Sequence, residues 1–149
     1  MTLGKLIISI AVLIGILLFN KTNPKVLKVI LLGFILSFIS SFFDKDFIID
    51  VSFLTFGFLT LSFLIYVIYN KQWLSSIIVV FPLLSFIFKS QHWPYASEIQ
   101  TLMIVPIIAY VIALNNLKNY KNQISILTIL VAYSISEVLR FVNYLISVN

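Results

Sequence analysis

The sequence has 149 residues, of which 61% are hydrophobic and only 10% charged, and its mean hydropathy is +1.11. Soluble domains average about 25% charged residues, so this composition excludes an ordinary water-soluble fold. The net charge of +5 comes from basic residues scattered singly between apolar runs, which argues against a nucleic-acid partner. We therefore predict an all-α bundle of six transmembrane helices that forms one domain over residues 1–149, with no soluble domain.

The first span is predicted over residues 3–19. Lys5 precedes the apolar run, as basic residues do in a secretory signal peptide, but no small-residue cleavage site follows the run. We therefore expect a retained helix. About 20 residues are needed to cross a bilayer, so this segment is slightly short, and Lys5 is expected at the interface.

The second and third spans are predicted over residues 26–43 and 47–69. The second contains Gly33 and several serines, which either allow close approach of a neighbouring helix or are simply tolerated there. Asp50 lies at the start of the third span, where a carboxylate suits the positive end of the helix dipole. A capping role for Asp50 and a ligand role are both open.

The fourth and fifth spans are predicted over residues 73–88 and 96–114. Pro82 interrupts the fourth and Pro106 the fifth, and each proline removes a backbone donor and favours a kink. Two adjacent kinked helices either enclose a cavity within the membrane or merely curve the bundle. The loop between them contains His92, and it is either a tight turn anchored at the interface or part of a site.

The sixth span, over residues 123–146, has opposite charges in its interior. Glu137 and Arg140 are three residues apart and therefore share one helical face, together with other polar residues. Ionisable groups inside a membrane normally face protein or water, so the other helices should pack around this face. The two charges are expected to pair and to lower each other's cost of insertion.

Six spans divide the loops between two sides of the membrane. One side receives six lysines, and the other receives both termini, three lysines and most of the acidic residues. Lysine and arginine favour the cytoplasmic side, so both termini are predicted to be non-cytoplasmic. The side with the termini also brings polar residues to similar depths. A candidate intramembrane cluster on that side consists of Asp50, Lys89, His92, Glu98, Glu137 and Arg140.

Three functions are compatible with such a cluster. An accessory or assembly subunit of a membrane complex would use Glu137 and Arg140 for pairing inside the membrane, and we favour this function. A proton-linked transporter or channel would use Glu137 as its protonatable centre. A lipid-modifying enzyme would use His92 as a base, but the sequence offers no recognisable nucleophile motif and no second histidine for a metal. We therefore expect no catalytic residues, metal or cofactor.

The loop around His92 also carries a local resemblance. Phe88-Lys89-Ser90-Gln91-His92-Trp93-Pro94-Tyr95-Ala96 resembles the Phe-Lys-x-x-His-Trp-Pro-Gly-Ala hairpin of small Bacteroidota membrane proteins, including the L subunit of the gliding and type IX secretion motor. Tyr95 replaces the usual glycine, and six spans differ from that subunit's single hairpin with a cytoplasmic tail. The resemblance implies a similar hairpin in a bacterial inner membrane, with this loop outside the cytoplasm.

Overall fold

The computed structural model describes residues 3–43, 45–93 and 96–148, and it is all-helical. Helices account for 86% of the described residues, and no strand occurs within these ranges, which confirms the predicted all-α class. The elements are α1 (Leu3–Leu17), η1 (Phe19–Lys21), α2 (Lys25–Ser40), α3 (Asp46–Tyr69), α4 (Trp73–Ser90), α5 (Ala96–Leu102), α6 (Ile104–Asn115), α7 (Leu117–Tyr120) and α8 (Ile124–Val148).

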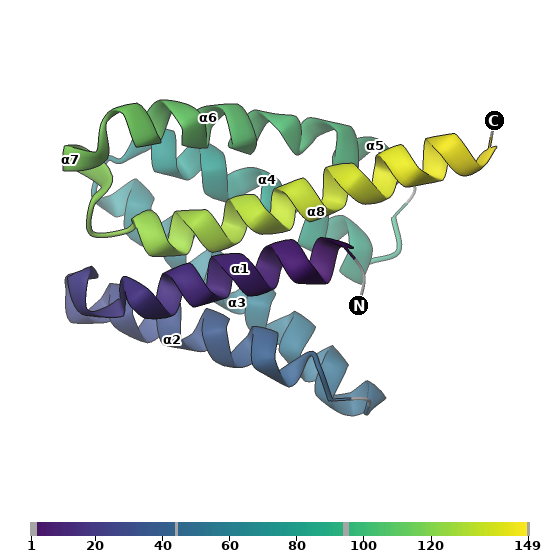
Figure 1. Ribbon diagram of the computed structural model, residues 1–149, viewed down its shortest axis with the longest axis horizontal. Coiled ribbons are helices and arrows are strands. Elements are labelled where there is room, and N and C mark those ends of the chain that lie inside the picture. The colour runs from purple at the N-terminus through teal and green to yellow at the C-terminus, as the bar shows by residue number, and fades with distance from the viewer. Residues whose placement is uncertain (1–2, 44, 94–95, 149) are drawn as a thin grey trace.

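The helices form a bundle with the connections at its two ends (Figure 1). The start of α1 and the end of α8 lie at one end, which we call the termini end. The connections from α2 to α3 and from α4 to α5 lie there too. The other end carries the connections with Lys21, Lys71 and Lys118, and we call it the lysine end.

Four segments are long and apolar enough to cross a membrane. They are α3, α4, the α5–α6 segment from Glu98 to Asn115, and α8. Helix α1 is apolar but has 15 residues, and α2 has 16, so they measure about 22 and 24 Å at 1.5 Å per residue. A hydrocarbon core is about 30 Å thick, so α1 and α2 are shorter than a full span.

The prolines affect the two predicted kinked helices differently. Helix α4 continues through Pro82, whereas the predicted fifth helix is divided at Met103 into α5 and α6. Pro106 cannot donate to the carbonyl of Leu102, and its ring crowds that carbonyl, so the helix breaks about one turn before the proline. The fifth predicted span is therefore interrupted at Met103 but stays one apolar segment from Glu98 to Asn115.

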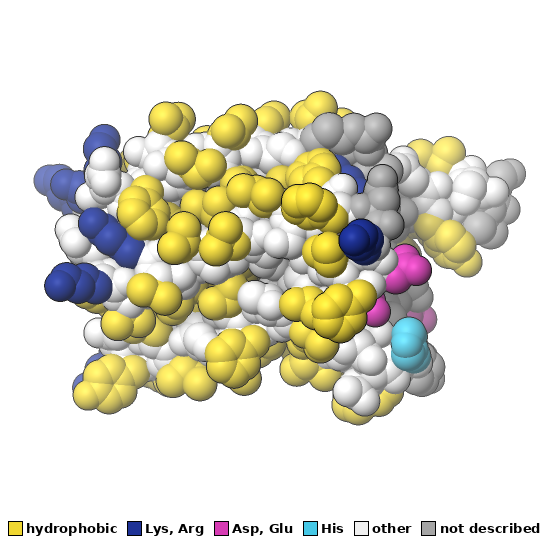
Figure 2. Space-filling view, turned by 90° about the horizontal axis from the view of Figure 1, so that it is seen from below, with side chains coloured by type: hydrophobic (Ala, Val, Ile, Leu, Met, Phe, Trp, Pro, Cys, Tyr) yellow, Lys and Arg dark blue, Asp and Glu magenta, His cyan; other side chains and the backbone are white. Residues whose placement is uncertain are grey.

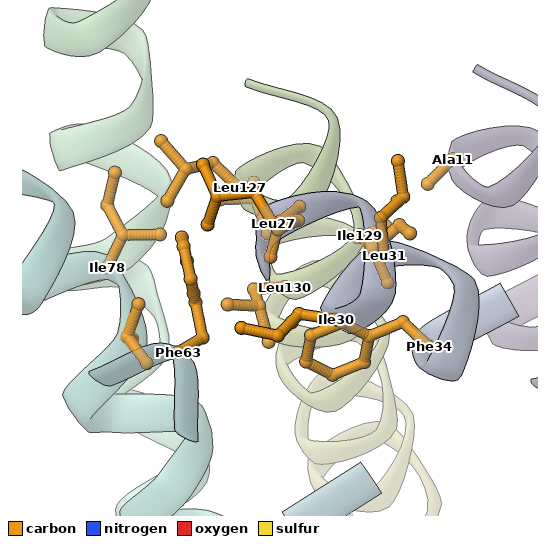
Figure 3. Close-up of a cluster of buried hydrophobic side chains, with 14 of the residues drawn as sticks. Ala11, Leu27, Ile30, Leu31, Phe34, Phe63, Ile78, Leu127, Ile129 and Leu130 are labelled. Carbon is orange, nitrogen blue, oxygen red and sulfur yellow. The ribbon is translucent and has the colours of Figure 1, made fainter. Parts of the chain in front are cut away.

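Helix α8 is the centre of the bundle. In its most apolar stretch 56% of the residues are buried, against 28–33% in the other three long segments. It packs against α1, α2, α4, α5 and α6. Figure 3 shows Leu127, Ile129 and Leu130 of α8 among buried side chains from four other helices. The expectation that the other helices surround this last segment agrees with this arrangement.

Small residues set how closely some helices approach. A Cβ added at Gly4 of α1 would overlap the hydroxyl of Ser136 on α8, and one added at Gly57 of α3 would overlap the ring of Phe86 on α4. Small side chains let helix backbones approach in a membrane, where packing rather than water drives association. Gly4 therefore fixes the crossing of α1 on α8 at the termini end.

Hydrogen bonds between side chains tie α8 to its neighbours near the lysine end. The hydroxyls of Thr22 and Ser125 are 2.9 Å apart, and Gln123 Nε2 donates to Ser75 Oγ at 2.8 Å. These groups are buried, so leaving any of them without a partner would cost free energy. The start of α8 is therefore held to α4 and to the segment after η1.

Candidate functional site

The buried carboxylate of Glu137 is the centre of the candidate site, toward the termini end of the bundle. Its side chain is 1% exposed. Lys89, in the last turn of α4, donates to Glu137 Oε2. Gln100 of α5 donates its Nε2 to the same oxygen at 3.1 Å, and Arg140 Nη1 lies 3.3 Å from Oε1. One carboxylate thus connects α4, α5 and α8.

The two cations differ in how far they are removed from solvent. The Lys89 side chain is 23% exposed, whereas that of Arg140 is 64% exposed. An exposed ion pair contributes little stability, because solvent screens it, whereas an uncompensated buried charge is costly. Lys89 is therefore the main counter-charge of Glu137, and Arg140 adds a weaker contact from one turn along α8.

An aromatic side chain adjoins the Lys89–Glu137 pair, one helical turn before Glu137 on α8. Tyr133 of α8 lies with its hydroxyl 3.4 Å from Ser85 Oγ, and Lys89 Nζ lies 6.0 Å from the centre of its ring. The ring of Phe56 on α3 is 4.9 Å from that of Tyr133, centre to centre. We call Lys89, Gln100, Glu137 and Arg140 the polar network. On the side that faces the inside of the bundle, this network ends against packed aromatic rings.

The six predicted cluster residues do not share one environment. Lys89, Glu137 and Arg140 interact directly. Asp50, His92 and Glu98 are exposed near the ends of their helices. The acid that contacts Arg140 in the described part of the chain is Glu137, one helical turn away on α8.

Sequence reasoning missed Gln100. The signal was a polar amide near the start of an otherwise apolar segment, two positions after Glu98. Its pairing with Glu137 could not be inferred, because 37 residues separate the two and their contact depends on α5 lying against α8.

His92 occupies a helix-ending position. Its φ is 51°, in the left-handed region, directly after the last residue and C-cap of α4. Its N–H bonds the carbonyl of Lys89, and the N–H of Trp93 bonds that of Phe88. The rings of Phe88 and Trp93 meet edge to face at 5.0 Å. Together these contacts form a Schellman motif with its usual hydrophobic contact.

The same geometry accounts for most of the motif that carries the family resemblance. Phe88 and Trp93 close the end of α4, and Lys89 compensates Glu137. Pro94 and Tyr95 lie outside the described residues. The described residues 88–93 therefore form a helix-ending turn, and Lys89 of the same motif belongs to the site around Glu137.

A cavity of about 260 Å³ lies beside the polar network. It lies between α1, α2, α3 and α8, and not between the two proline-containing segments, for which a cavity was one of two alternatives. Its walls include Lys5, Ile8, Phe34, Ser37, Phe38, Ser41, Ile49, Ser52, Phe53, Phe56, Ile129, Tyr133 and Arg140.

The described residues contain no group of three His, Asp or Glu side chains placed to hold a metal ion. No family model, curated protein or solved structure matches the chain. The resemblance of the His92 loop to the Bacteroidota hairpin stays a prediction. Chemically, the arrangement around Glu137 is a carboxylate whose negative charge is compensated by neighbouring cations and which links three helices.

Proposed function

We propose that this protein is a six-span membrane protein that serves as an accessory or assembly subunit of a membrane complex. The observation that carries the proposal is the end of α8. This helix has 25 residues, or about 37 Å, and its C-terminal end extends past the other helices (Figure 1). The bundle therefore leaves a helix end available to another subunit.

That helix end is apolar as well as uncovered. Val142, Tyr144, Leu145 and Ile146 are all exposed, and the side chain of Ile146 is 70% exposed. A helix longer than the hydrocarbon core of about 30 Å extends into or beyond the interface, where apolar side chains need a cover. An apolar helix of a second membrane protein would provide that cover.

The compensation of Glu137 also favours a structural function over proton transport. A carboxylate that carries protons must exchange them with water, but Glu137 is buried and both of its oxygens accept from protein donors. Breaking this arrangement would leave Lys89 without its counter-charge. The network is suited to holding α4, α5 and α8 together while α8 presents its end to a partner.

The transmembrane orientation that we propose follows from the distribution of charge. Figure 2 shows Lys and Arg gathered mostly at one end of the molecule and Asp, Glu and His at the other, with hydrophobic side chains along the flank between them. The basic end is the lysine end, which the positive-inside rule places in the cytoplasm. Both termini are then outside the cytoplasm. The resemblance of the His92 loop to the Bacteroidota hairpin is what favours a bacterial inner membrane in this proposal.

A photo-crosslinking residue at position 144, in native membranes, tests the subunit function. We expect Tyr144→p-benzoylphenylalanine to form an adduct with one other membrane protein, which also co-purifies in a constant ratio. The same residue at Phe58, whose side chain is 70% exposed on α3, is the matched control and should label lipid. Leu145→Lys should abolish co-purification without reducing the folded yield.

Two results would contradict the subunit function. One is equal labelling from positions 144 and 58, with no protein recovered in a constant ratio. The other is pH-driven flux in proteoliposomes of the purified protein that disappears in Glu137→Gln, because that result would assign Glu137 to proton transfer.

A further inference from the structure

The cavity beside the polar network has a charged entrance and an apolar interior. Among its lining residues, Lys5, Ile49 and Arg140 are exposed, and all three lie toward the termini end. Phe34 and Ile129, which line it farther inside, are buried. The cavity therefore leads from two cations into the apolar centre of the bundle.

The hydroxyl groups in the walls need no polar occupant. Ser37 Oγ donates to the carbonyl of Ser52 at 2.6 Å, and Ser52 Oγ donates to that of Ile48 at 2.6 Å. Ser41 Oγ donates to the carbonyl of Phe38 at 2.7 Å. Because backbone carbonyls already satisfy these donors, the surface inside the entrance suits an apolar chain.

The dimensions suit a lipid tail. From Arg140 to Ile129 is eleven residues along α8, or about 16 Å, roughly half of a hydrocarbon core about 30 Å thick. Arg140 is sixteen residues, or about 24 Å, from the start of α8 at Ile124, so its guanidinium can reach the headgroup level. The cavity thus has its cations at headgroup depth and its apolar walls at acyl-chain depth.

Arg140 retains donors for a second acceptor. Its contact with Glu137 uses Nη1, and a guanidinium has five N–H donors in all. Guanidinium groups bind phosphate with paired hydrogen bonds, and Lys5 adds a second positive charge at the entrance.

We propose that this cavity binds an anionic phospholipid, with its phosphate at Arg140 and Lys5 and one acyl chain between α1, α2, α3 and α8. The charge of the entrance matches the headgroup, and the surrounding bilayer supplies the lipid at the depth where the cavity opens. Arg140 adjoins the partner surface at positions 142–146 of α8, but lipid binding is measured on the purified protein and the partner contact in native membranes, so failure of one is distinguishable from failure of the other.

Native mass spectrometry of the purified protein in detergent tests this site. Dioleoylphosphatidylglycerol is titrated against dioleoylphosphatidylcholine, which has the same chains and no net charge. We expect one molecule of the anionic lipid to bind at least tenfold more tightly. Arg140→Gln and Lys5→Gln should each weaken its binding about tenfold, the effect of losing a charged hydrogen bond. Lys118→Gln, an exposed change at the lysine end, should have no effect.

A second pair of variants tests where the chain lies. Ile49→Trp places a large ring at the entrance, and Ile65→Trp places the same ring on an exposed position of α3 that does not line the cavity. Only the first should block binding. Equal affinity for the two lipids, unchanged binding in Lys5→Gln, unchanged binding in Ile49→Trp, or equally tight binding of free oleate would each overturn the proposal.

Discussion

At the scale of single residues, the main feature is a carboxylate whose principal partner is distant in sequence. Helical spacing placed Glu137 beside Arg140, and the two are in contact. The more buried cation at Glu137, however, is Lys89 of α4. Removing one member of a buried pair leaves an uncompensated charge, whereas removing both can be nearly neutral.

We therefore expect Glu137→Leu or Lys89→Leu to destabilise the folded protein by about 3–5 kcal/mol, and the double variant to regain most of that loss. Arg140→Leu should cost no more than about 1 kcal/mol, because that side chain is largely exposed. Unfolding in detergent, followed by loss of helical signal, measures all four variants. If Arg140→Leu destabilised the folded protein as much as Lys89→Leu does, the assignment of Lys89 as the main partner of Glu137 would be wrong.

At the scale of elements, α3 and α4 end in the same way without glycine. Lys71 and His92 each adopt positive φ, of 56° and 51°, after the C-cap. The N–H of Gln72 bonds the carbonyl of Val67, as that of Trp93 bonds Phe88. Residues with a Cβ pay roughly 1–2 kcal/mol for a left-handed conformation, and glycine is the usual residue at this position.

His92→Gly should therefore raise stability by about 1 kcal/mol, and His92→Val should lower it. Lys71→Gly is the matched control at the end of α3 and should also be stabilising. Thermal unfolding of the purified variants measures the three changes. A loss of stability in His92→Gly, together with a gain in Lys71→Gly, would indicate that the imidazole makes a contact that outweighs the backbone cost.

At the scale of the whole molecule, the proposal of six spans predicts on which side of the membrane each connection lies. Four segments have the length and hydropathy of a span, and α1 is shorter. A short apolar helix can still cross if the bilayer thins around it, at a modest cost. The connection that carries Lys21 distinguishes six spans from four, because it changes sides if α1 and α2 do not cross.

The chain has no natural cysteine, so single cysteines can report the side of each connection. With six spans, a membrane-impermeant maleimide applied to intact cells should label Ser147→Cys and not Lys21→Cys or Asn116→Cys. Lysed cells, in which all three variants should react, are the control. Labelling of Lys21→Cys together with Ser147→Cys would reduce the spans to four. Labelling of Lys21→Cys and Asn116→Cys without Ser147→Cys would reverse the orientation of the six spans.

The sequence by itself determined the helical class, the approximate helix limits and the face of α8 that carries Glu137 and Arg140. These depend on local properties, namely hydropathy, the period of a helix and the chemistry of proline. It did not determine that Lys89 and Gln100 meet Glu137, or that a cavity lies between α1, α2, α3 and α8. Forty-eight residues separate Lys89 from Glu137, and apolar helices offer many similar ways to pack. Only the tertiary structure decides which faces meet, because that choice depends on how side chains from distant segments fit together.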